Sequence, residues 1–427
     1  MINGNIRFVV IIQRIVDYWL LAPIIEEALK QPWSIECWHD TSLSREGLKS
    51  YLFADVKSVP HFENGQPLVF GFDGEPELRT LMRERPTTIS VCLNPPSFYH
   101  EKRPPEDKSI WLTVQHAVDT LITHSPEHLL TSDLVALYSR WWIHWTGRHY
   151  QEELQVENRS DFEESLQKKA ITVGFPAHDV AAKIDPTEVR QRWNIPQDQP
   201  VVLLLPFPQG VGKGAFWPSM IFGQPSRFRR AMGVLARRRF KYWPDIWHDA
   251  TDASVVQAIR AFCDLNGSYL LVKSRKKTPI PPYTQKLADK CLYDEQYYPA
   301  TFFEALSIAS LSISFYSTAV ISAASFGVPH LCITFPTDDY CGDDKLLRER
   351  CDRFYTAENG SPFHFPGVTK AVTIAEAIEQ LPQTKLDEFA IDHTARQRYL
   401  EQYAWPNDHH ASERVIETLI HRLNDGS

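Results

Sequence analysis

The sequence lacks paired cysteines. Its 427 residues contain seven cysteines, an odd number, and no two of them have the spacing Cys-x-x-Cys. This pattern argues against a disulfide framework and against a structural zinc site, and it favours a reducing compartment. We therefore expect a cytoplasmic protein.

The sequence also shows no pattern typical of a membrane-spanning helix or a secretory signal. The longest apolar stretch, residues 8–25, contains Gln13, Arg14 and Asp17, which a spanning helix would bury at a cost of several kcal/mol. Neither a basic amino-terminal region nor a small-residue cleavage site indicates a signal peptide. If the protein meets a membrane, we expect it to bind at the inner face.

An excess of positive charge is absent from the chain as a whole. Lys and Arg number 45 against 53 Asp and Glu, which gives a net charge of −8, so we expect no nucleic-acid partner. Residues 199–244 are different, because they contain no Asp or Glu. Their composition suits an anionic membrane surface or a phosphate-bearing acceptor, with RNA as a competing ligand and a solvated helix as the ordinary alternative. The cationic side chains are Lys213, Arg227, Arg229, Arg230, Arg237, Arg238, Arg239 and Lys241, interleaved with aromatic residues.

The remaining composition is that of a folded α/β protein. Hydrophobic residues make up 43% and charged residues 23%, which excludes a mainly disordered chain and a coiled coil. The chain is too long for one compact core. Short apolar runs recur at intervals that leave room for crossover helices, as in parallel α/β domains. These runs lie at residues 6–12, 34–38, 67–72, 88–93 and 109–114, and again at 201–205, 269–272, 311–315 and 329–334.

This spacing predicts two α/β domains. We expect an amino-terminal domain over residues 1–180 and a second domain over 181–395, with the basic aromatic insertion at 207–248. Residues 411–423 have the apolar periodicity of an amphipathic helix within a last segment, 396–427.

The most informative segment is FYSTAVISAASFGVPHLCI, at residues 315–333. A strand ends at Ser317 and Thr318, and a small-residue helix follows. Hydroxyl groups and free amides at the start of a helix suit a phosphate group, although an ordinary helix cap would look the same.

The chain resembles the GT-B glycosyltransferases. The resemblance lies in RIVDYWLLAPIIEEAL, VQHAVDT, ITVGFPAHD, PVVLLLPFP and YYPATFFEALSIASLSISFYSTAVISAASFGVP, which occur in the family's order and spacing. The resemblance is in particular to the branch with CDP-glycerol glycerophosphotransferases, bacterial surface-polysaccharide transferases and UDP-GlcNAc 2-epimerases. It implies two Rossmann-like domains facing a cleft, and a carboxyl-terminal helix that crosses back to the first domain.

The resemblance also implies a donor site in the second domain. Ser317 and Thr318 would hold the donor pyrophosphate, and Lys273 with Arg275 would neutralise it, although KSRKK is equally typical of a solvated loop. Ser322 stands where many relatives have an acidic residue that binds ribose. KSRKK also replaces a Lys-x-His-Pro segment of the glycerophosphotransferases, which favours sugar transfer over glycerol-phosphate transfer.

The candidate catalytic residues lie in the amino-terminal domain. A strand at 109–114 should deliver Gln115, His116 and Asp119 to its carboxyl end, where open α/β sheets bind ligands. His116 is the first candidate for the base, and Asp119 would orient it or act itself. A structural role is the alternative for a single histidine at a strand end.

Asp17 follows the first strand and, together with Arg14, is a further candidate for contact with acceptor or donor. Its alternative role is that of a carboxylate at a helix amino terminus, where the helix dipole stabilises it.

No metal or resident cofactor is expected. In QGVGKGAF a glycine follows Lys213, where a phosphate loop of the Walker type needs Ser or Thr for magnesium. No Asp-x-Asp pair stands at a clear strand end, and GT-B enzymes usually stabilise the leaving diphosphate with helix dipoles and basic residues.

The expected activity is metal-independent, inverting transfer of a sugar from a nucleotide donor to a bacterial surface glycan or lipid-linked acceptor. The alternatives are a polyol-phosphate transferase, a UDP-sugar 2-epimerase, or a binding scaffold that has lost its catalytic site.

Overall fold

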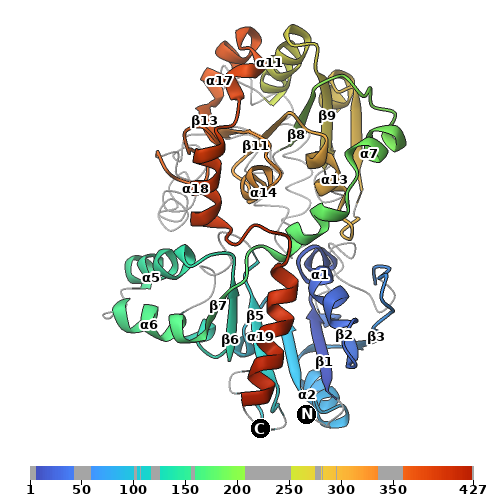
Figure 1. The fold of residues 1–427 in the computed structure, drawn as a ribbon, viewed down its shortest axis with the longest axis vertical. Helices are drawn as coiled ribbons and strands as arrows, with labels where there is room; N and C mark the ends of the chain where they lie inside the picture. The colour runs from blue at the N-terminus through green and yellow to red at the C-terminus, as the bar shows by residue number, and fades with distance from the viewer. Residues whose placement is uncertain are drawn as a thin grey trace, which may run out of the picture. The chain divides into compact units, whose positions relative to one another are not determined.

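The computed structural model divides the chain into two compact units (Figure 1). Unit 1 comprises Met1–Lys183, Gln296–Ala300 and Leu400–Ser427, and unit 2 comprises Ile184–Glu295 and Thr301–Tyr399. The structure describes residues 6–42, 59–100, 103–105, 107–116, 126–154, 159–206, 252–274, 280, 282–294, 296–334 and 359–425.

Unit 1 contains a seven-stranded parallel sheet in the order β3-β2-β1-β4-β5-β6-β7. The strands form where the sequence has β-branched and other apolar runs, which pack well on a pleated surface that is buried on both faces. The strands are β1 (Arg7–Ile12), β2 (Ser34–Asp40), β3 (Leu68–Phe72), β4 (Ile89–Cys92), β5 (Ile110–Val114), β6 (Leu134–Leu137) and β7 (Ala170–Thr172).

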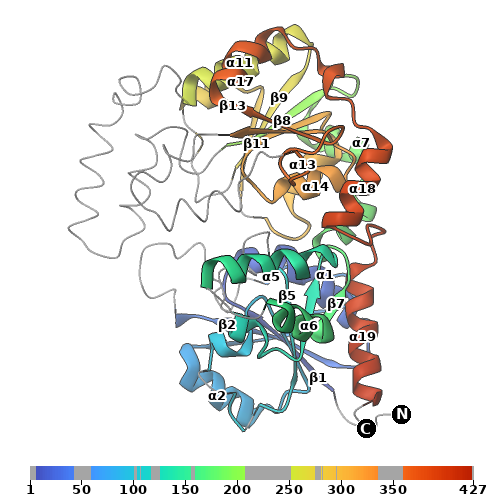
Figure 2. The same ribbon diagram turned by 90° about the vertical axis from the view of Figure 1, so that its left-hand side faces the viewer.

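Helices cover both faces of this sheet. Val9 and Ile11 of β1 pack with Leu78 and Met82 of α2 on one face. Figure 2 shows α2 and α19 on opposite sides of the sheet, and α19 contacts α1. The helices are η1 (Ile15–Asp17), α1 (Tyr18–Ala28), α2 (Gly74–Glu84), η4 (Pro96–Phe98), α4 (Pro126–Leu129), α5 (Trp141–Leu154), α6 (Arg159–Lys169), η5 (Pro176–Lys183) and α19 (Ala411–Asp425).

The carboxyl-terminal helix α19 is part of unit 1, as the predicted crossover requires. The Asp179 carboxylate caps its first turn by accepting the amides of Ala411 at 3.0 Å and Ser412 at 2.7 Å. The Arg414 guanidinium donates to the carbonyl of Val173 at 2.8 and 2.9 Å. These bonds join the last helix to the segment that follows β7.

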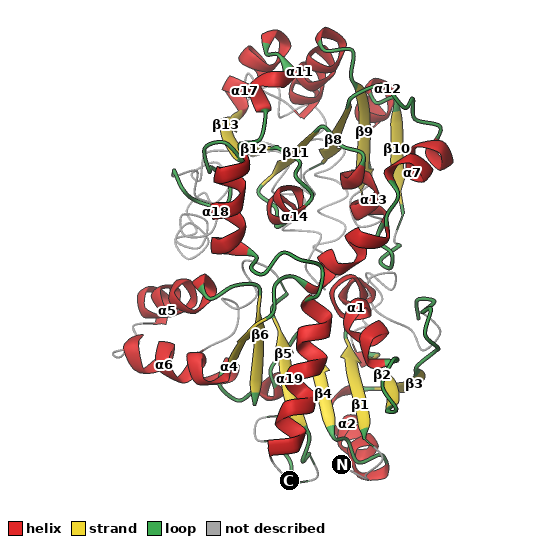
Figure 3. Ribbon diagram, viewed as in Figure 1, coloured by secondary structure: helices red, strands yellow, loops and turns green. Residues whose placement is uncertain are grey.

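Unit 2 contains a six-stranded parallel sheet in the order β10-β9-β8-β11-β12-β13 (Figure 3). Its strands are β8 (Val201–Leu205), β9 (Tyr269–Ser274), β10 (Lys290–Tyr293), β11 (Leu311–Phe315), β12 (His330–Thr334) and β13 (Thr369–Thr373). Its helices are α7 (Pro186–Trp193), α11 (Asp252–Leu265), α12 (Pro282–Leu287), α13 (Thr301–Ser307), α14 (Ala319–Ser325), α17 (Ile374–Gln380), η6 (Leu381–Gln383) and η7 (Leu386–Phe389), while α18 (His393–Tyr403) begins in unit 2 and ends in unit 1.

The two faces of the unit 2 sheet differ in polarity. Alternate residues such as Leu311 and Ile313 join the core formed with α11 and α17. The opposite face carries Ser312 and Ser314, whose hydroxyls lie 3.2 and 3.0 Å from the ring nitrogens of buried His330. Burial lowers the pKa of His330 to about 3.

These two sheets confirm the predicted α/β class, with two Rossmann-like units. Each apolar run predicted as a strand overlaps a strand of the structure, and β2 and β9 extend two residues beyond the predicted runs.

Unit 1 should be sensitive to a methyl group at Gly174. This glycine has φ +86°, and a Cβ there would lie 2.2 Å from the Pro406 carbonyl oxygen. We expect Gly174→Ala to lower the free energy of unfolding by about 3 kcal/mol or more, measured by denaturant titration. The control is Gly360→Ala, where φ is +90° and no atom lies within 4 Å, so only the backbone cost of about 1–2 kcal/mol applies. Equal losses in the two variants would contradict the steric explanation.

Protonation of His330 should destabilise unit 2 in mild acid. Its folded pKa lies below the unfolded value of about 6.5, so the unfolded state binds more protons and stability falls as the pH drops below that value. Between pH 7 and pH 5 this residue should cost about 2 kcal/mol. We expect His330→Gln to lose about 2 kcal/mol less than the wild type over this interval, measured by urea unfolding. A parallel decline in both proteins would count against this role.

Candidate functional site

Three residues predicted from separate segments meet at the carboxyl edge of the unit 1 sheet. Arg14 and Asp17 follow β1, and His116 follows β5. All strands of the sheet are parallel, so these ends lie on one edge. β1 and β4 are neighbours at the point where the strand order reverses, which is where open α/β sheets form ligand crevices.

The Asp17 carboxylate is the most deeply buried group of this cluster. One oxygen accepts the backbone amides of Arg14 at 2.8 Å and Gln13 at 3.2 Å. The other oxygen lies 3.3 Å from Nε of Arg14. Burial raises the pKa of Asp17 above its ordinary value, and the Arg14 charge and the backbone amides partly offset the rise. Asp17 therefore shapes the turn after β1 and orients Arg14.

Arg14 joins Asp17 to His116. Its side chain is 38% exposed, against 4% for Asp17. Nη2 of Arg14 lies 3.3 Å from Nδ1 and 3.5 Å from Nε2 of the His116 ring. The guanidinium thus has the buried carboxylate on one side and the imidazole on the other.

Gln115 supports the site without facing a ligand. Its side chain is fully buried and its Oε1 accepts the amide of Tyr138 at 3.0 Å. The expectation that Gln115 reaches into a ligand site is therefore not met, because successive residues of an extended chain point to opposite sides.

Sequence reasoning missed Tyr138, Asn94 and Gln13. The Tyr138 hydroxyl donates to the carbonyl of His116 at 2.8 Å, and its ring stacks on Phe175 with centroids 4.0 Å apart. The Asn94 amide lies 3.5 Å from the Gln13 oxygen. Each of the three residues follows a strand of this sheet by one or two positions, which is the signal that could have found them.

In unit 2, Ser317 and Thr318 stand at the carboxyl end of β11, immediately before α14. The amides predicted to be free are already used within the chain. The amide of Ala319 donates to the Ser317 hydroxyl at 3.3 Å, and those of Val320 and Ile321 donate to the carbonyls of Ser317 and Thr318. A phosphate at this position would have to be held by the hydroxyls or by rearranged amides.

Ser322 lies on the buried face of α14 and is fully inaccessible to solvent. Ser322 follows Ser317 by only five positions, but the helix directs its side chain into the interior of unit 2. In this conformation it contacts no ligand that approaches from solvent.

Lys273, at the end of β9, is buried and hydrogen-bonded. Its ammonium donates to the Ser274 carbonyl at 2.9 Å and to the carbonyl and Oδ1 of Asp294 at 3.3 Å each. Thr301 donates to the same Asp294 oxygen at 2.9 Å. Three acceptors match the three N–H groups of a lysine, so binding a diphosphate would require Lys273 to break one of these bonds.

The other predicted residues fall outside the described part of the chain. These are Asp119, Arg275 and the basic aromatic insertion at 207–248. Among the described residues, no group of three or more His, Cys, Asp or Glu side chains is arranged to hold a metal ion. No described helix combines the length and apolar character needed to cross a membrane.

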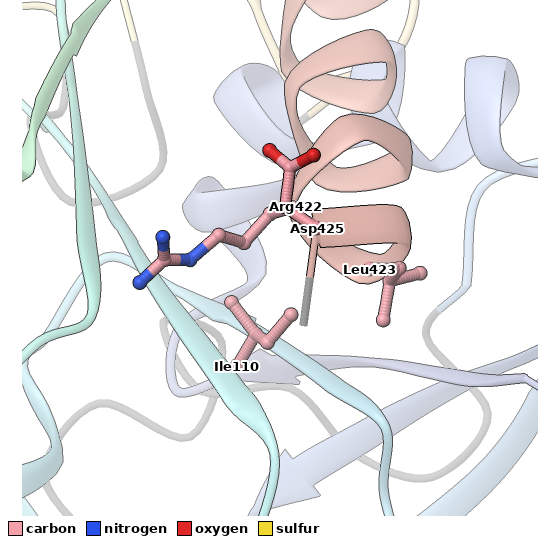
Figure 4. Close-up of a pocket in the computed structure, with 4 residues that line it drawn as sticks. All are labelled: Ile110, Arg422, Leu423 and Asp425. Atoms are coloured by element: carbon pink, nitrogen blue, oxygen red, sulfur yellow. The ribbon is translucent and has the colours of Figure 1, made fainter. Parts of the chain in front are cut away.

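A hollow of about 390 Å³ lies elsewhere on unit 1 (Figure 4). It is lined by Ile110 at the start of β5 and by Arg422, Leu423 and Asp425 near the end of α19. Ile110 marks the amino edge of the sheet, opposite the edge that carries His116. This hollow is therefore separate from the candidate site.

Comparison with known proteins shows the fold. No protein-family model matches the chain, and no curated protein matches it in sequence. Among solved structures, the wall teichoic acid polymerase TagF matches with a TM-score of 0.55 and 10% identity, over 99% of this chain and 90% of that chain. A TagF structure soaked with CDPG matches with a TM-score of 0.51 and 11% identity, over 99% and 90%.

A second kind of enzyme matches as well. A putative UDP-N-acetylglucosamine 2-epimerase from Listeria monocytogenes has a TM-score of 0.50 and 12% identity, over 99% of this chain and 98% of that chain. Identities this low establish the fold alone. The chain therefore has the GT-B fold that its motifs predicted.

The structure assigns Lys273 a stabilising ion pair, which a double-mutant cycle can measure. We expect Asp294→Leu to lower the free energy of unfolding of unit 2 by about 2–3 kcal/mol, because it removes a carboxylate that pairs with a buried ammonium. Lys273→Met in the same background should recover most of that loss. If the two changes are additive, measured by urea unfolding, Lys273 and Asp294 are not coupled.

Proposed function

We propose that the protein is a glycosyltransferase that moves a sugar from a nucleotide-activated donor to an acceptor hydroxyl. The observation that supports this most is the convergence of His116, Arg14 and Asp17 at the carboxyl edge of unit 1, within a GT-B fold. An imidazole at the carboxyl edge of the sheet, held in place by Arg14 and by the bond from Tyr138 to its backbone carbonyl, can accept a proton in a defined position.

In the proposed reaction His116 is the general base. It takes the proton of the acceptor hydroxyl while that oxygen attacks the anomeric carbon and the bond to the nucleoside diphosphate breaks. The Tyr138 hydroxyl, just after β6, holds the backbone carbonyl of His116, and Arg14, just after β1, contacts its ring. Attack opposite the leaving group inverts the anomeric configuration. Asp119 remains a second candidate for orienting or replacing His116.

Unit 2 supplies the donor site in this proposal. Ser317 and Thr318, which stand half-buried at the end of β11, would bind the diphosphate with Arg275. Lys273 would assist if it exchanged one of its bonds to Asp294 for a phosphate oxygen. Hydroxyl donors and basic side chains would stabilise the leaving group without a metal ion.

Polyol-phosphate transfer and epimerisation are the alternative activities, because TagF and a putative UDP-N-acetylglucosamine 2-epimerase have the same fold. The decisive experiment incubates the protein with UDP-, CDP- and GDP-linked sugars and with CDP-glycerol, and then identifies the product. A transferred sugar supports the main proposal, a transferred glycerol phosphate supports the alternative, and an altered sugar still attached to its nucleotide indicates an epimerase.

We place the acceptor at the cytoplasmic face of the membrane, as a bacterial surface glycan or a lipid-linked precursor. Support comes from the composition of residues 199–244, which combine cationic and aromatic side chains without any acid. Such a segment would concentrate the enzyme beside an anionic acceptor.

The role of His116 leads to a kinetic prediction. His116→Ala should lower turnover by about 10²-fold or more while the affinity for the nucleotide donor stays nearly unchanged, because a general base acts in the transition state. Asp119→Asn should cost less. Steady-state kinetics with the donor that the product assay identifies, together with donor titration by calorimetry, measures both effects. Unchanged turnover in His116→Ala would transfer the role to Asp17 or Asp119.

A further inference from the structure

The backbone of His116 continues from the end of a sheet ladder. The amide of Gln115 donates to the carbonyl of Ala136 at 2.9 Å, which extends the pairing of β5 with β6. His116 lies one position beyond this bond. Beyond the end of a ladder, a backbone keeps one conformation only where other contacts hold it. The position of His116 therefore depends on the residues packed around the end of β5.

Tyr138 supplies two contacts to the end of β5. Its amide donates to Oε1 of Gln115 at 3.0 Å, and its hydroxyl donates to the carbonyl of His116 at 2.8 Å. Tyr138 is fully buried, and its ring stacks on Phe175 with the two ring planes 20° apart. Two consecutive residues at the end of β5 are thus bonded to one residue whose own ring is fixed by packing.

The segment between α18 and α19 holds Tyr138 in turn. The carbonyl of Tyr138 accepts the backbone amide of Trp405 at 2.8 Å. Close by in sequence, the indole nitrogen of Trp142 donates to the carbonyl of Tyr403 at 3.0 Å, although 261 positions separate these two residues. The end of α18 and the residues after it are therefore joined to the start of α5 and to the residue that holds His116.

A third bond completes this connection, because the Ser139 hydroxyl donates to the carbonyl of Gln402. We call the three bonds between residues 402–405 and residues 138–142 the clamp. All of these residues belong to unit 1. Ser139 and Trp142 are at most 1% exposed, so water does not readily replace a clamp bond that is broken.

We propose that the clamp positions the base of the reaction, which makes Tyr138 and Trp142 positioning residues for the transfer step. The inference rests on the proposed function, in which His116 takes the proton of the acceptor hydroxyl. A general base must lie within about 2.6–3.2 Å of the oxygen that carries the proton. A displacement of about 1 Å can lower the rate about a hundredfold. By fixing the backbone that carries the imidazole, the clamp keeps the ring within that range.

The alternative role of the clamp is stability alone, because its bonds also attach the carboxyl-terminal segment to α5. The two roles differ when the base is absent. A clamp that only stabilises unit 1 would affect the enzyme equally with and without His116. A clamp that positions the base affects the turnover of folded enzyme only while His116 is present.

The test compares turnover per folded molecule in Tyr138→Phe and Trp142→Phe, each of which removes one hydrogen-bond donor and keeps an aromatic ring. We expect turnover to fall about tenfold in Tyr138→Phe and about threefold or more in Trp142→Phe, while donor affinity stays nearly unchanged. In a His116→Ala background neither change should lower turnover further. A second fall of the same size in that background would overturn the inference.

The matched control is Trp38→Phe, at another fully buried tryptophan of unit 1. This change removes the indole bond to the Glu36 carboxylate at 2.9 Å, which lies outside the clamp. We expect wild-type turnover from its folded fraction, which near-ultraviolet circular dichroism measures for each variant. A fall in Trp38→Phe as large as that in Trp142→Phe would assign the effect to the loss of any buried indole bond and would contradict the inference.

NMR spectra of the full chain, labelled on histidine, test the positioning without any reaction. The His116 signals are identified by their loss in His116→Ala. We expect them to shift or broaden in Tyr138→Phe and Trp142→Phe and to stay as in the wild type in Trp38→Phe. Unchanged signals in the first two variants would overturn the inference. Changed signals together with full turnover in His116→Ala would instead refute the proposed base and leave the clamp as the element that fixes His116.

Discussion

The carboxylate of Asp17 determines how the candidate site is built. A buried carboxylate is costly unless hydrogen bonds and a counterion replace water, and here two amides and the Arg14 guanidinium do so. Through these contacts Asp17 closes the turn after β1 and directs Arg14 toward a histidine 102 positions further along the chain. The Tyr138 hydroxyl donates to the backbone carbonyl of the same histidine. The geometry of the site thus depends on one local turn within a parallel sheet.

The strands and this cluster could be predicted because both depend on local sequence. A β-branched apolar run ends where polar residues begin, and in a parallel sheet all carboxyl ends share one edge. That reasoning brings Arg14, Asp17 and His116 to one place, as the structure does. It fails for Gln115, because a strand end known only to within a residue or two leaves open which side chain points outward.

The donor side was less predictable because its interactions are not local. The partner of Lys273 is Asp294, which lies beyond a helix and a strand, and nothing near the KSRKK segment indicates it. The first three amides of α14 are satisfied by bonds to Ser317 and Thr318, a conformation that hydroxyl residues favour but do not specify. Ser322 is buried because the small-residue helix packs that face inward, which a count from Ser317 does not reveal.

The position of α19 has a consequence for the order in which the protein can fold during synthesis. Unit 1 begins with β1, but it is complete only when the helix at residues 411–425 has formed its hydrogen bonds to Asp179 and Val173. All of unit 2 is translated before that helix, so on the ribosome unit 2 can be complete while unit 1 still exposes the surface that α19 covers. A protein of this topology completes its first domain last, and until then the apolar residues beneath α19 stay exposed to water.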